Sequence, residues 1–216
     1  MVEGEKSVIE LINSELILTN VFATPEWIKS NASTLNIPIT EASKVDLERM
    51  SFFKTASPVI ATAKQPENRS LDLTQKWILA LDGINDPGNL GTIIRIADWY
   101  GISQIYCSPT TVDQFNPKTI SSTMGSFTRV SVQYLDLVEL LKSTNKTAYF
   151  TLMEGESIYK TAAPSGGIIV IGSEANGISN ELMSIPHNSI TIPRVGNAES
   201  LNAAVATGII CDRLTQ

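Results

Sequence analysis

The sequence has little of what metal, disulfide and redox sites require. Its 216 residues include one histidine, His187, and two cysteines, Cys107 and Cys211, which have no metal-like spacing. A multi-histidine metal site is therefore excluded, no metal is expected, and the cysteines are predicted to be buried thiols in a reducing cytoplasm. Long apolar runs are also missing, since none approaches the roughly 20 residues that span a bilayer. The first residues lack the basic-then-apolar layout of a signal peptide.

Positive charge is scarce as well. The chain has 16 Lys and Arg residues against 22 Asp and Glu residues, which gives a formal net charge of -6. Proteins that hold nucleic acid mainly by a broad cationic surface are basic, so that class is excluded. Any RNA partner must instead contact a local cluster of positive side chains.

Two common phosphate-binding motifs are absent. The loop after the predicted strand 77–81 has no Gly-x-Gly-x-x-Gly sequence, and the chain has no Gly-Lys-Ser or Gly-Lys-Thr phosphate loop. A Rossmann-type oxidoreductase is therefore disfavoured.

The beginning of the chain is predicted to be a small αβαβαβ domain over residues 1–63. Thr24 and Pro25 mark one helix start, as N-cap and first-turn residue. The predicted helices cover 4–15, a segment from 24 onward, and 43–50, and the predicted strands cover 16–22, 37–39 and 57–63. The segment 64–70 is the most polar of the chain, which puts a domain linker at 64–75.

In residues 76–216 strands alternate with helices, which predicts an α/β domain with a mostly parallel sheet covered on both sides. The run 168–171 is continuously β-branched, as expected of a strand buried on both faces. The predicted strands are 77–81, 102–107, 129–132, 148–152, 168–171 and 190–192, and the predicted helices are 90–100, 116–124, 135–142 and a last one from Ser200. The last helix has an apolar stripe made of Leu201, Ala204, Val205, Gly208 and Ile209.

Glycine-rich strand ends with polar neighbours occur late in the chain, at Gly172 and Gly196. Ligands of open α/β sheets bind beyond the carboxyl ends of strands. This region therefore predicts a binding site for a flat and mostly neutral molecule.

Three ordered segments carry a more specific signal: 85–95 (NDPGNLGTIIR), 171–177 (IGSEANG) and 192–202 (IPRVGNAESLN). In order and spacing they resemble the three motifs of the SpoU branch of the SPOUT methyltransferases, over about residue 76 to the C-terminus. The resemblance implies methyl transfer from S-adenosylmethionine to a ribose 2′-hydroxyl of RNA. It also implies a C-terminal trefoil knot, which periodicity alone does not predict.

Carried over by position, the resemblance implies a cofactor site at Leu152, Gly172, Glu174, Ile192 and Leu201. Ile192 and Leu201 offer the apolar walls that an adenine ring needs. Taken singly, each of these residues is better explained as a core or loop residue; together in three ordered motifs they favour the cofactor site.

The same resemblance implies a reaction centre at Asn89, Arg95, Ser200 and Asn202. Because a guanidinium stays protonated in proteins, Arg95 is better suited to hold a phosphate and a developing oxyanion than to act as a base. The simpler alternatives are a solvated Arg95, Ser200 as a helix N-cap, and Asn202 as a polar first-turn residue. The local cluster of positive side chains that an acidic chain needs to contact RNA is predicted to consist of Arg95, Lys118, Arg129 and Arg194.

Residues 1–63 resemble, more weakly, the small RNA substrate-binding domain that often precedes this catalytic domain and is similar to a ribosomal fold. Many members have a basic helix and strand upstream, so the resemblance implies a shortened RNA grip or missing first residues. The expected partners are RNA, ribosomal rather than transfer RNA, and a second copy in a homodimer. A transfer RNA methyltransferase and a non-catalytic knotted RNA-binding or ribosome-assembly protein remain alternatives.

Overall fold

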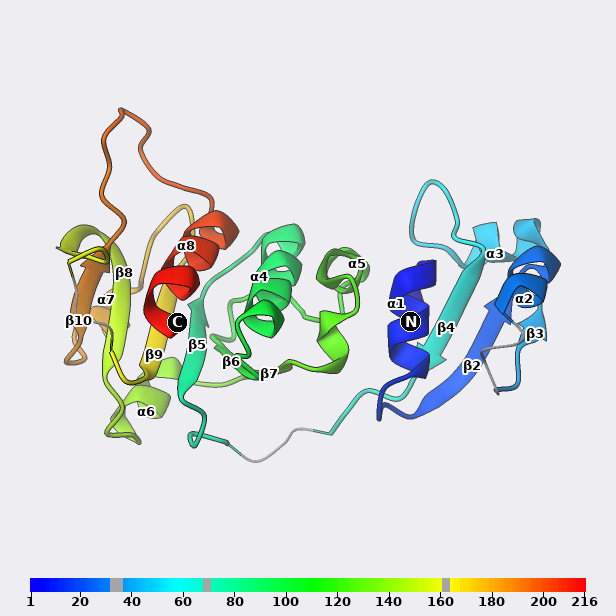
Figure 1. The fold of residues 1–216 in the computed structure, drawn as a ribbon, viewed down its shortest axis with the longest axis horizontal. Coiled ribbons are helices and arrows are strands. Elements are labelled where there is room, and N and C mark those ends of the chain that lie inside the picture. The colour runs from blue at the N-terminus through cyan, green and yellow to red at the C-terminus, as the bar shows by residue number, and fades with distance from the viewer. Residues whose placement is uncertain (32–36, 68–70, 161–163) are drawn as a thin grey trace. The chain divides into compact units, whose positions relative to one another are not determined.

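The computed structural model describes residues 1–31, 37–67, 71–160 and 164–216. The chain divides into two compact units, Met1–Glu67 and Asn68–Gln216, which are described separately (Figure 1). Residues 68–70 of the predicted linker 64–75 lie outside the described residues.

The first unit is a four-stranded sheet with the order β1-β4-β2-β3, in which β4 runs antiparallel to β1 and β2 while β3 runs parallel to β2. The sequence predicted the alternation of the later elements but missed β1, which has only two residues. The elements are β1 (Val2–Glu3), α1 (Glu5–Ile12), β2 (Leu18–Ala23), α2 (Pro25–Asn31), β3 (Thr40–Glu41), α3 (Lys44–Met50) and β4 (Val59–Ala63).

One predicted strand of this unit is displaced. The strand expected at 37–39 is instead β3, Thr40–Glu41, after Pro38, which has no backbone N–H to donate to a ladder. The predicted helix start at Thr24 is correct: its hydroxyl oxygen accepts a hydrogen bond from the Trp27 N–H at 3.3 Å, and Trp27 is buried in the core.

The second unit contains one six-stranded sheet with the order β10-β8-β9-β5-β6-β7, and every neighbouring pair is parallel. The prediction of a mostly parallel sheet is therefore confirmed. Its strands are β5 (Trp77–Asp82), β6 (Gln104–Cys107), β7 (Ser131–Tyr134), β8 (Ala148–Ser157), β9 (Gly167–Gly172) and β10 (Asn188–Thr191). Its helices are α4 (Pro87–Trp99), α5 (Pro117–Thr123), the 3-10 turn η1 (Ser126–Thr128), α6 (Leu137–Lys142), α7 (Asn180–Met183) and α8 (Ala203–Thr215).

Both faces of this sheet are buried, as the apolar strand runs predict. Along β5 the side chains of Leu79 and Leu81 pack with α4 and α8, whereas Ile78 and Ala80 pack with α6 and α7 on the opposite face. Figure 1 shows α4 and α8 side by side over one face of the sheet. The strand is continuously apolar because its alternate side chains pack into two different cores, one on each face of the sheet.

Several predicted boundaries were wrong for local reasons. Helix α4 begins at Pro87 because Asp86 caps it, although the apolar periodicity starts only at Leu90. Helix α8 begins at Ala203, not Ser200, and its N-cap is Asn202. The short helix α7 was not predicted, and β8 runs five residues past the expected end at Leu152.

The two cysteines are free and buried. Burial raises the pKa of the Cys211 thiol to about 12 and the pKa of Cys107 as well, so neither offers a thiolate near neutral pH. None of the helices in the described part of the chain is both long and apolar enough to cross a bilayer.

Candidate active site

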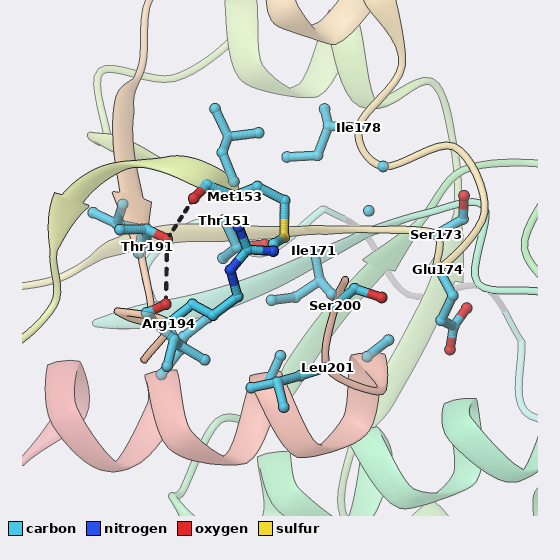
Figure 2. A pocket seen from close by; sticks show the side chains of 18 of the residues that line it. Thr151, Met153, Ile171, Ser173, Glu174, Ile178, Thr191, Arg194, Ser200 and Leu201 are labelled. Atoms are coloured by element: carbon cyan, nitrogen blue, oxygen red, sulfur yellow. Dashed lines mark hydrogen bonds between the residues drawn. The ribbon is translucent and has the colours of Figure 1, made fainter. Parts of the chain in front are cut away.

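The middle of β8 and the carboxyl ends of β9 and β10 line a cavity of about 740 Å³ (Figure 2). Loops leave β9 and β10 there, and the start of α8 contributes a further part of the lining. The lining includes Leu152 and Met153 within β8, Gly172 to Gly177 at the end of β9 and in the loop that follows, Ile192 and Arg194 after β10, and Ser200 and Leu201 before α8.

The loop after β9 is closed on itself. Ser173 and Gly177 exchange two backbone hydrogen bonds, from Ser173 N at 3.0 Å and from Gly177 N at 2.9 Å. Gly177 has a φ of 66°, a left-handed conformation that disfavours residues with a Cβ. Beyond the loop, the Asp82 carboxylate at the end of β5 accepts a hydrogen bond from Ser179 N at 2.8 Å. The loop is therefore fixed from within and from the neighbouring strand.

Gly172 allows this loop to lie close to its own strand. A Cβ at Gly172 would lie 2.3 Å from the carbonyl carbon of Gly177 and 2.5 Å from the nitrogen of Ile178. The sequence singled out Gly172 as a cofactor contact. The structure shows that the space a Cβ would take at this position is filled by backbone atoms of Gly177 and Ile178.

A bulge in β8 forms a wall of the cavity that the sequence prediction missed. Ser189 pairs with Phe150, whereas the next residue, Ile190, pairs with Glu156, so five residues of β8 have no partner on β10. The Thr191 hydroxyl donates to Met153 O at 3.1 Å and holds the bulge against β10 (Figure 2). Gly155, within the strand, is the signal that could have revealed it, because glycine inside a strand often marks a bulge.

The loop after β10 lines the cavity before α8 begins. Pro193 follows the strand, and the Arg194 Nη1 donates to Ala198 O at 3.1 Å. Figure 2 shows the Arg194 side chain extending among the lining residues, with Ser200 and Leu201 on the side of α8. This loop thus brings an arginine and a serine to the same opening.

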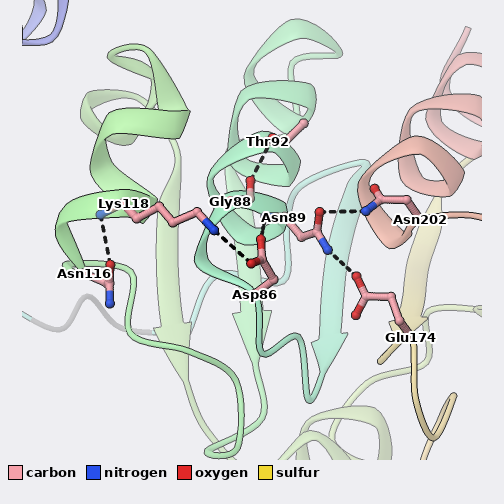
Figure 3. A network of polar contacts seen from close by, with 8 residues as sticks. All are labelled: Asp86, Gly88, Asn89, Thr92, Asn116, Lys118, Glu174 and Asn202. Atoms are coloured by element: carbon pink, nitrogen blue, oxygen red, sulfur yellow. Dashed lines mark hydrogen bonds and ion pairs between the residues drawn. The ribbon is translucent and has the colours of Figure 1, made fainter. Parts of the chain in front are cut away.

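A chain of side-chain hydrogen bonds joins the three motif segments at the rim (Figure 3). The Asn89 Nδ2 donates to Glu174 Oε1, and Asn202 Nδ2 donates to Asn89 Oδ1 at 2.9 Å. Asn202 Oδ1 in turn accepts from Ala204 N at 3.0 Å and caps α8. Asn89 therefore aligns the loop after β9 with the start of α8.

The start of α4 is held by an ion pair next to Asn89. Asp86 accepts from Asn89 N at 2.9 Å as the N-cap, and Lys118 Nζ lies 3.0 Å from its other oxygen (Figure 3). The hydrogen bond from Lys118 and that from Asn89 N hold the pKa of the Asp86 carboxyl below its ordinary value of 3.8. Asp86 is consequently a carboxylate at neutral pH and fixes Asn89 through the backbone.

Arg95 lies apart from the cavity. It is exposed on α4 six residues after Asn89, about 9 Å further along the helix axis, and does not line the cavity. Within the described ranges its guanidinium has no ion-pair or hydrogen-bond partner, whereas Lys118 pairs with Asp86 and Arg129 pairs with Asp98 at 2.8 Å. Among these cations Arg95 is thus available to an external anion.

The structure brings together most, but not all, of the residues that the sequence proposed. All five expected cofactor residues line the cavity, namely Leu152, Gly172, Glu174, Ile192 and Leu201. Ser200 lines it as well. Asn89 and Asn202 meet at its rim. Two local readings were wrong, because Ser200 lies before the helix and Asn202, not Ser200, is its cap.

Comparison with known proteins identifies the family. The model of the SpoU rRNA methylase family matches residues 76–212. The chain belongs to this family. The predicted resemblance is therefore confirmed, and its three motifs are the segments that the hydrogen bonds of Asn89 connect.

The similarity to known proteins extends over both units of the chain. It is 30% identical over 215 residues to the 23S rRNA (guanosine(2553)-2'-O)-methyltransferase RlmP of Bacillus subtilis, covering 97% of this chain and 86% of the relative. A solved TrmH-family structure from Porphyromonas gingivalis has a TM-score of 0.88 and 31% identity, with 99% and 88% of the two chains covered. The AdoMet-bound rRNA methyltransferase from Sinorhizobium meliloti has a TM-score of 0.81 and 25% identity, with 99% and 85% covered.

The cavity fits S-adenosylmethionine. Its volume falls within the roughly 300–1,000 Å³ typical of small-molecule sites. Leu152, Ile192 and Leu201 offer apolar surface for an adenine ring, while the two loops bring backbone N–H and C=O groups to the same space. A Cβ at Gly196 would meet nothing within 4 Å, so this part of the wall leaves open room.

Proposed function

We propose that this chain transfers a methyl group from S-adenosylmethionine to a ribose 2′-hydroxyl of ribosomal RNA. The observation that carries the proposal is the joining of Asn89, Glu174 and Asn202 at the rim of a cavity that fits the cofactor. The name of the Bacillus subtilis relative, a 23S rRNA 2'-O-methyltransferase, supports ribosomal over transfer RNA.

In this proposal the rim residues orient the ribose and the cavity orients the cofactor, which supplies the methyl group when bound. Glu174 and Asn202 fix the amide of Asn89 from both sides. Ser200 adds a hydroxyl at the cavity wall. Positioning of this kind lowers the barrier of a two-reactant step because the entropy of alignment is removed beforehand.

Arg95 contributes charge. A guanidinium remains protonated, so it cannot accept the 2′-hydroxyl proton, but it can bind the neighbouring phosphate through paired N–H groups and stabilise negative charge on the attacking oxygen. The absence of a partner for its guanidinium among the described residues supports this role, because Lys118 and Arg129 are paired with carboxylates.

A homodimer that packs through α4 and α8 forms part of the proposal. These helices leave large apolar side chains in water: Trp99 is 83% exposed, and Leu201 and Val205 are exposed beside the start of α8. The other two tryptophans, Trp27 and Trp77, are buried. Contact with a second copy would cover Trp99, and Arg95, one helical turn before it, would then face that copy.

Two further parts of the proposal rest on the family resemblance. The first unit, residues 1–63 in the sequence prediction, would bind the RNA substrate, and the segment around the cavity would form the trefoil knot. The connection from β10 to α8 lines the same cavity as β8 and the loop after β9, which supports the knot. A cytoplasmic location is in keeping with two free, buried cysteines.

Mapping of 2′-O-methylation across total RNA, with and without the protein, tests the proposal. We expect one ribosomal site to lose its methyl group when the protein is absent and to regain it with purified protein and S-adenosylmethionine. Loss at a transfer RNA site would assign the chain to that substrate. An unchanged methylation map combined with no calorimetric binding of S-adenosylmethionine would favour the non-catalytic RNA-binding alternative.

A further inference from the structure

The loop between α3 and β4 presents two aromatic rings to solvent. Phe52 is 63% exposed and Phe53 is 38% exposed, at the start of the connection that precedes β4 (Figure 1). We call residues 52–56 the aromatic loop. Lys54 is the one charged residue between Ser51 and Ala63 in the sequence, so no carboxylate of the loop opposes an anion there.

A buried carboxylate holds both ends of this loop. Glu3 Oε1 accepts a hydrogen bond from the Ser51 hydroxyl at 2.7 Å and another from Ser57 N at 3.0 Å. The Ser51 hydroxyl oxygen also accepts from Phe53 N at 2.9 Å, which fixes the backbone beside the two rings. Next to Ser57, Pro58 O accepts from Thr24 N at 2.9 Å. The exposed loop is thus anchored to β1 through Glu3 and to the junction of β2 and α2 through Thr24.

The anchoring residue is costly to bury. Glu3 is only 8% exposed, and its Oε2 is buried without a hydrogen-bond partner in the part of the chain that the structure describes. Burial of a charged group with incomplete hydrogen bonding is unfavourable. A rigid geometry of the aromatic loop would explain why such a residue is kept there.

We propose that the aromatic loop binds an unpaired nucleotide of the RNA substrate, with its base stacked on Phe52 or Phe53 and its phosphate near Lys54. Single-stranded RNA is typically recognised by bases that stack on aromatic side chains beside cations. Glu3 is then a positioning residue that acts through Ser51 and Ser57. The inference rests on the proposed function and specifies where the first unit contacts RNA.

RNA is favoured over a protein partner by the shape and charge of the loop. Two adjacent rings at a loop form a small stacking surface, whereas stable protein interfaces need a broad apolar core. The lysine between the second ring and the uncharged remainder of the loop is complementary to phosphate. A second copy of this chain is the competing occupant, and the experiment separates the two.

The test measures the affinity of the full chain for a fluorescein-labelled single-stranded RNA of mixed sequence by anisotropy, and for the duplex that it forms with its complement. Phe52→Ala should weaken single-strand binding about 5- to 100-fold, the range expected when one stacking ring is removed. Phe52→Trp should restore it. Ile17→Ala is the matched control, because Ile17 is a 60% exposed apolar residue of the same unit.

Glu3 is tested by rescue. Glu3→Ala should lower the single-strand affinity, and Glu3→Gln, which keeps one carbonyl acceptor for Ser51 and Ser57, should restore most of it. Calorimetric affinity for S-adenosylmethionine should stay unchanged in all these variants. If Glu3→Ala does not fold, the Phe52 variants alone decide the inference, since that side chain is exposed.

Three outcomes overturn the inference. Equal binding by Phe52→Ala and Ile17→Ala would show that the ring does not contact RNA. A preference of the wild type for the duplex would exclude an unpaired base. A change in mass by light scattering for Phe52→Ala, with unchanged RNA affinity, would make the loop a contact between copies. In each case normal methyl transfer by the wild type leaves the proposed function intact, whereas a wild type that binds neither S-adenosylmethionine nor RNA removes both.

Discussion

Replacement of Gly172 by alanine is the sharpest test of how the cavity is built. The added Cβ would lie 2.3 Å from the Gly177 carbonyl carbon and 2.5 Å from both the Gly177 oxygen and the Ile178 nitrogen. These are backbone atoms, so no side chain can rotate away. Relief requires the loop to move off the strand, which breaks the two backbone hydrogen bonds between Ser173 and Gly177.

The expected magnitude follows from these two effects. Overpacking of a closed site costs about 1–3 kcal/mol, and each lost backbone hydrogen bond adds about 0.5–1.5 kcal/mol. We expect the free energy of unfolding of Gly172→Ala to fall by roughly 2–6 kcal/mol. If about 2 kcal/mol of this displacement must be reversed to bind S-adenosylmethionine, its affinity falls about 30-fold. The valine variant should bind still more weakly.

Gly196→Ala is the matched control. Gly196 lines the same cavity, but a Cβ there meets nothing within 4 Å. Isothermal titration with S-adenosylmethionine and denaturant unfolding should give nearly wild-type values for this variant and losses for Gly172→Ala. Wild-type affinity and stability in Gly172→Ala would refute the reasoning, and equal losses in both variants would show that the cavity has been misassigned.

The remaining predictions concern charge, assembly and pH. Arg95→Ala should lower the single-turnover rate of methyl transfer about 10²-fold or more while S-adenosylmethionine affinity stays unchanged, and Arg95→Lys should recover part of the rate with a similar pH profile; a near wild-type rate for Arg95→Ala would leave the residue a surface arginine. Trp99 is 83% exposed in the single chain, and the proposed homodimer would cover it. Its fluorescence, isolated by comparison with Trp99→Phe, should therefore resist acrylamide quenching at micromolar concentration; ready quenching, or a monomer by light scattering, would contradict the dimer. Because the pKa of Asp86 is lowered from 3.8, its stabilisation of the fold is present above that pH and is lost as the pH falls through the lowered pKa. Unfolding midpoints of the wild type and Asp86→Asn should therefore converge under acid conditions, and a constant difference would exclude this linkage.

Local patterns in the sequence were sufficient for all six strands and most helices of the second unit, although they missed the short helix α7 and several boundaries. The continuous apolar runs at 77–81 and 168–171 predicted strands buried on both faces, and they became the neighbouring strands β5 and β9. The three ordered motifs predicted the family, and their glycines and polar residues pointed to the cavity. The strands can be predicted from the sequence because the periodicity and composition of a segment depend on what the segment packs against.

Tertiary structure alone decided which polar groups meet. Asn89 lies 85 positions from Glu174 and 113 from Asn202. Their hydrogen bonds depend on the pairing of β5 with β9 and on the packing of α8 against α4, which no local pattern predicts. The same holds for the local role of Gly172, whose missing Cβ leaves room for the backbone at Gly177. Even the cap of α8 required the fold, because Ser200 and Asn202 are both good N-cap residues and the contact with Asn89 distinguishes them. The sequence by itself determined the elements, the family and the candidate residues, whereas the packing of the sheet determined how those residues are joined.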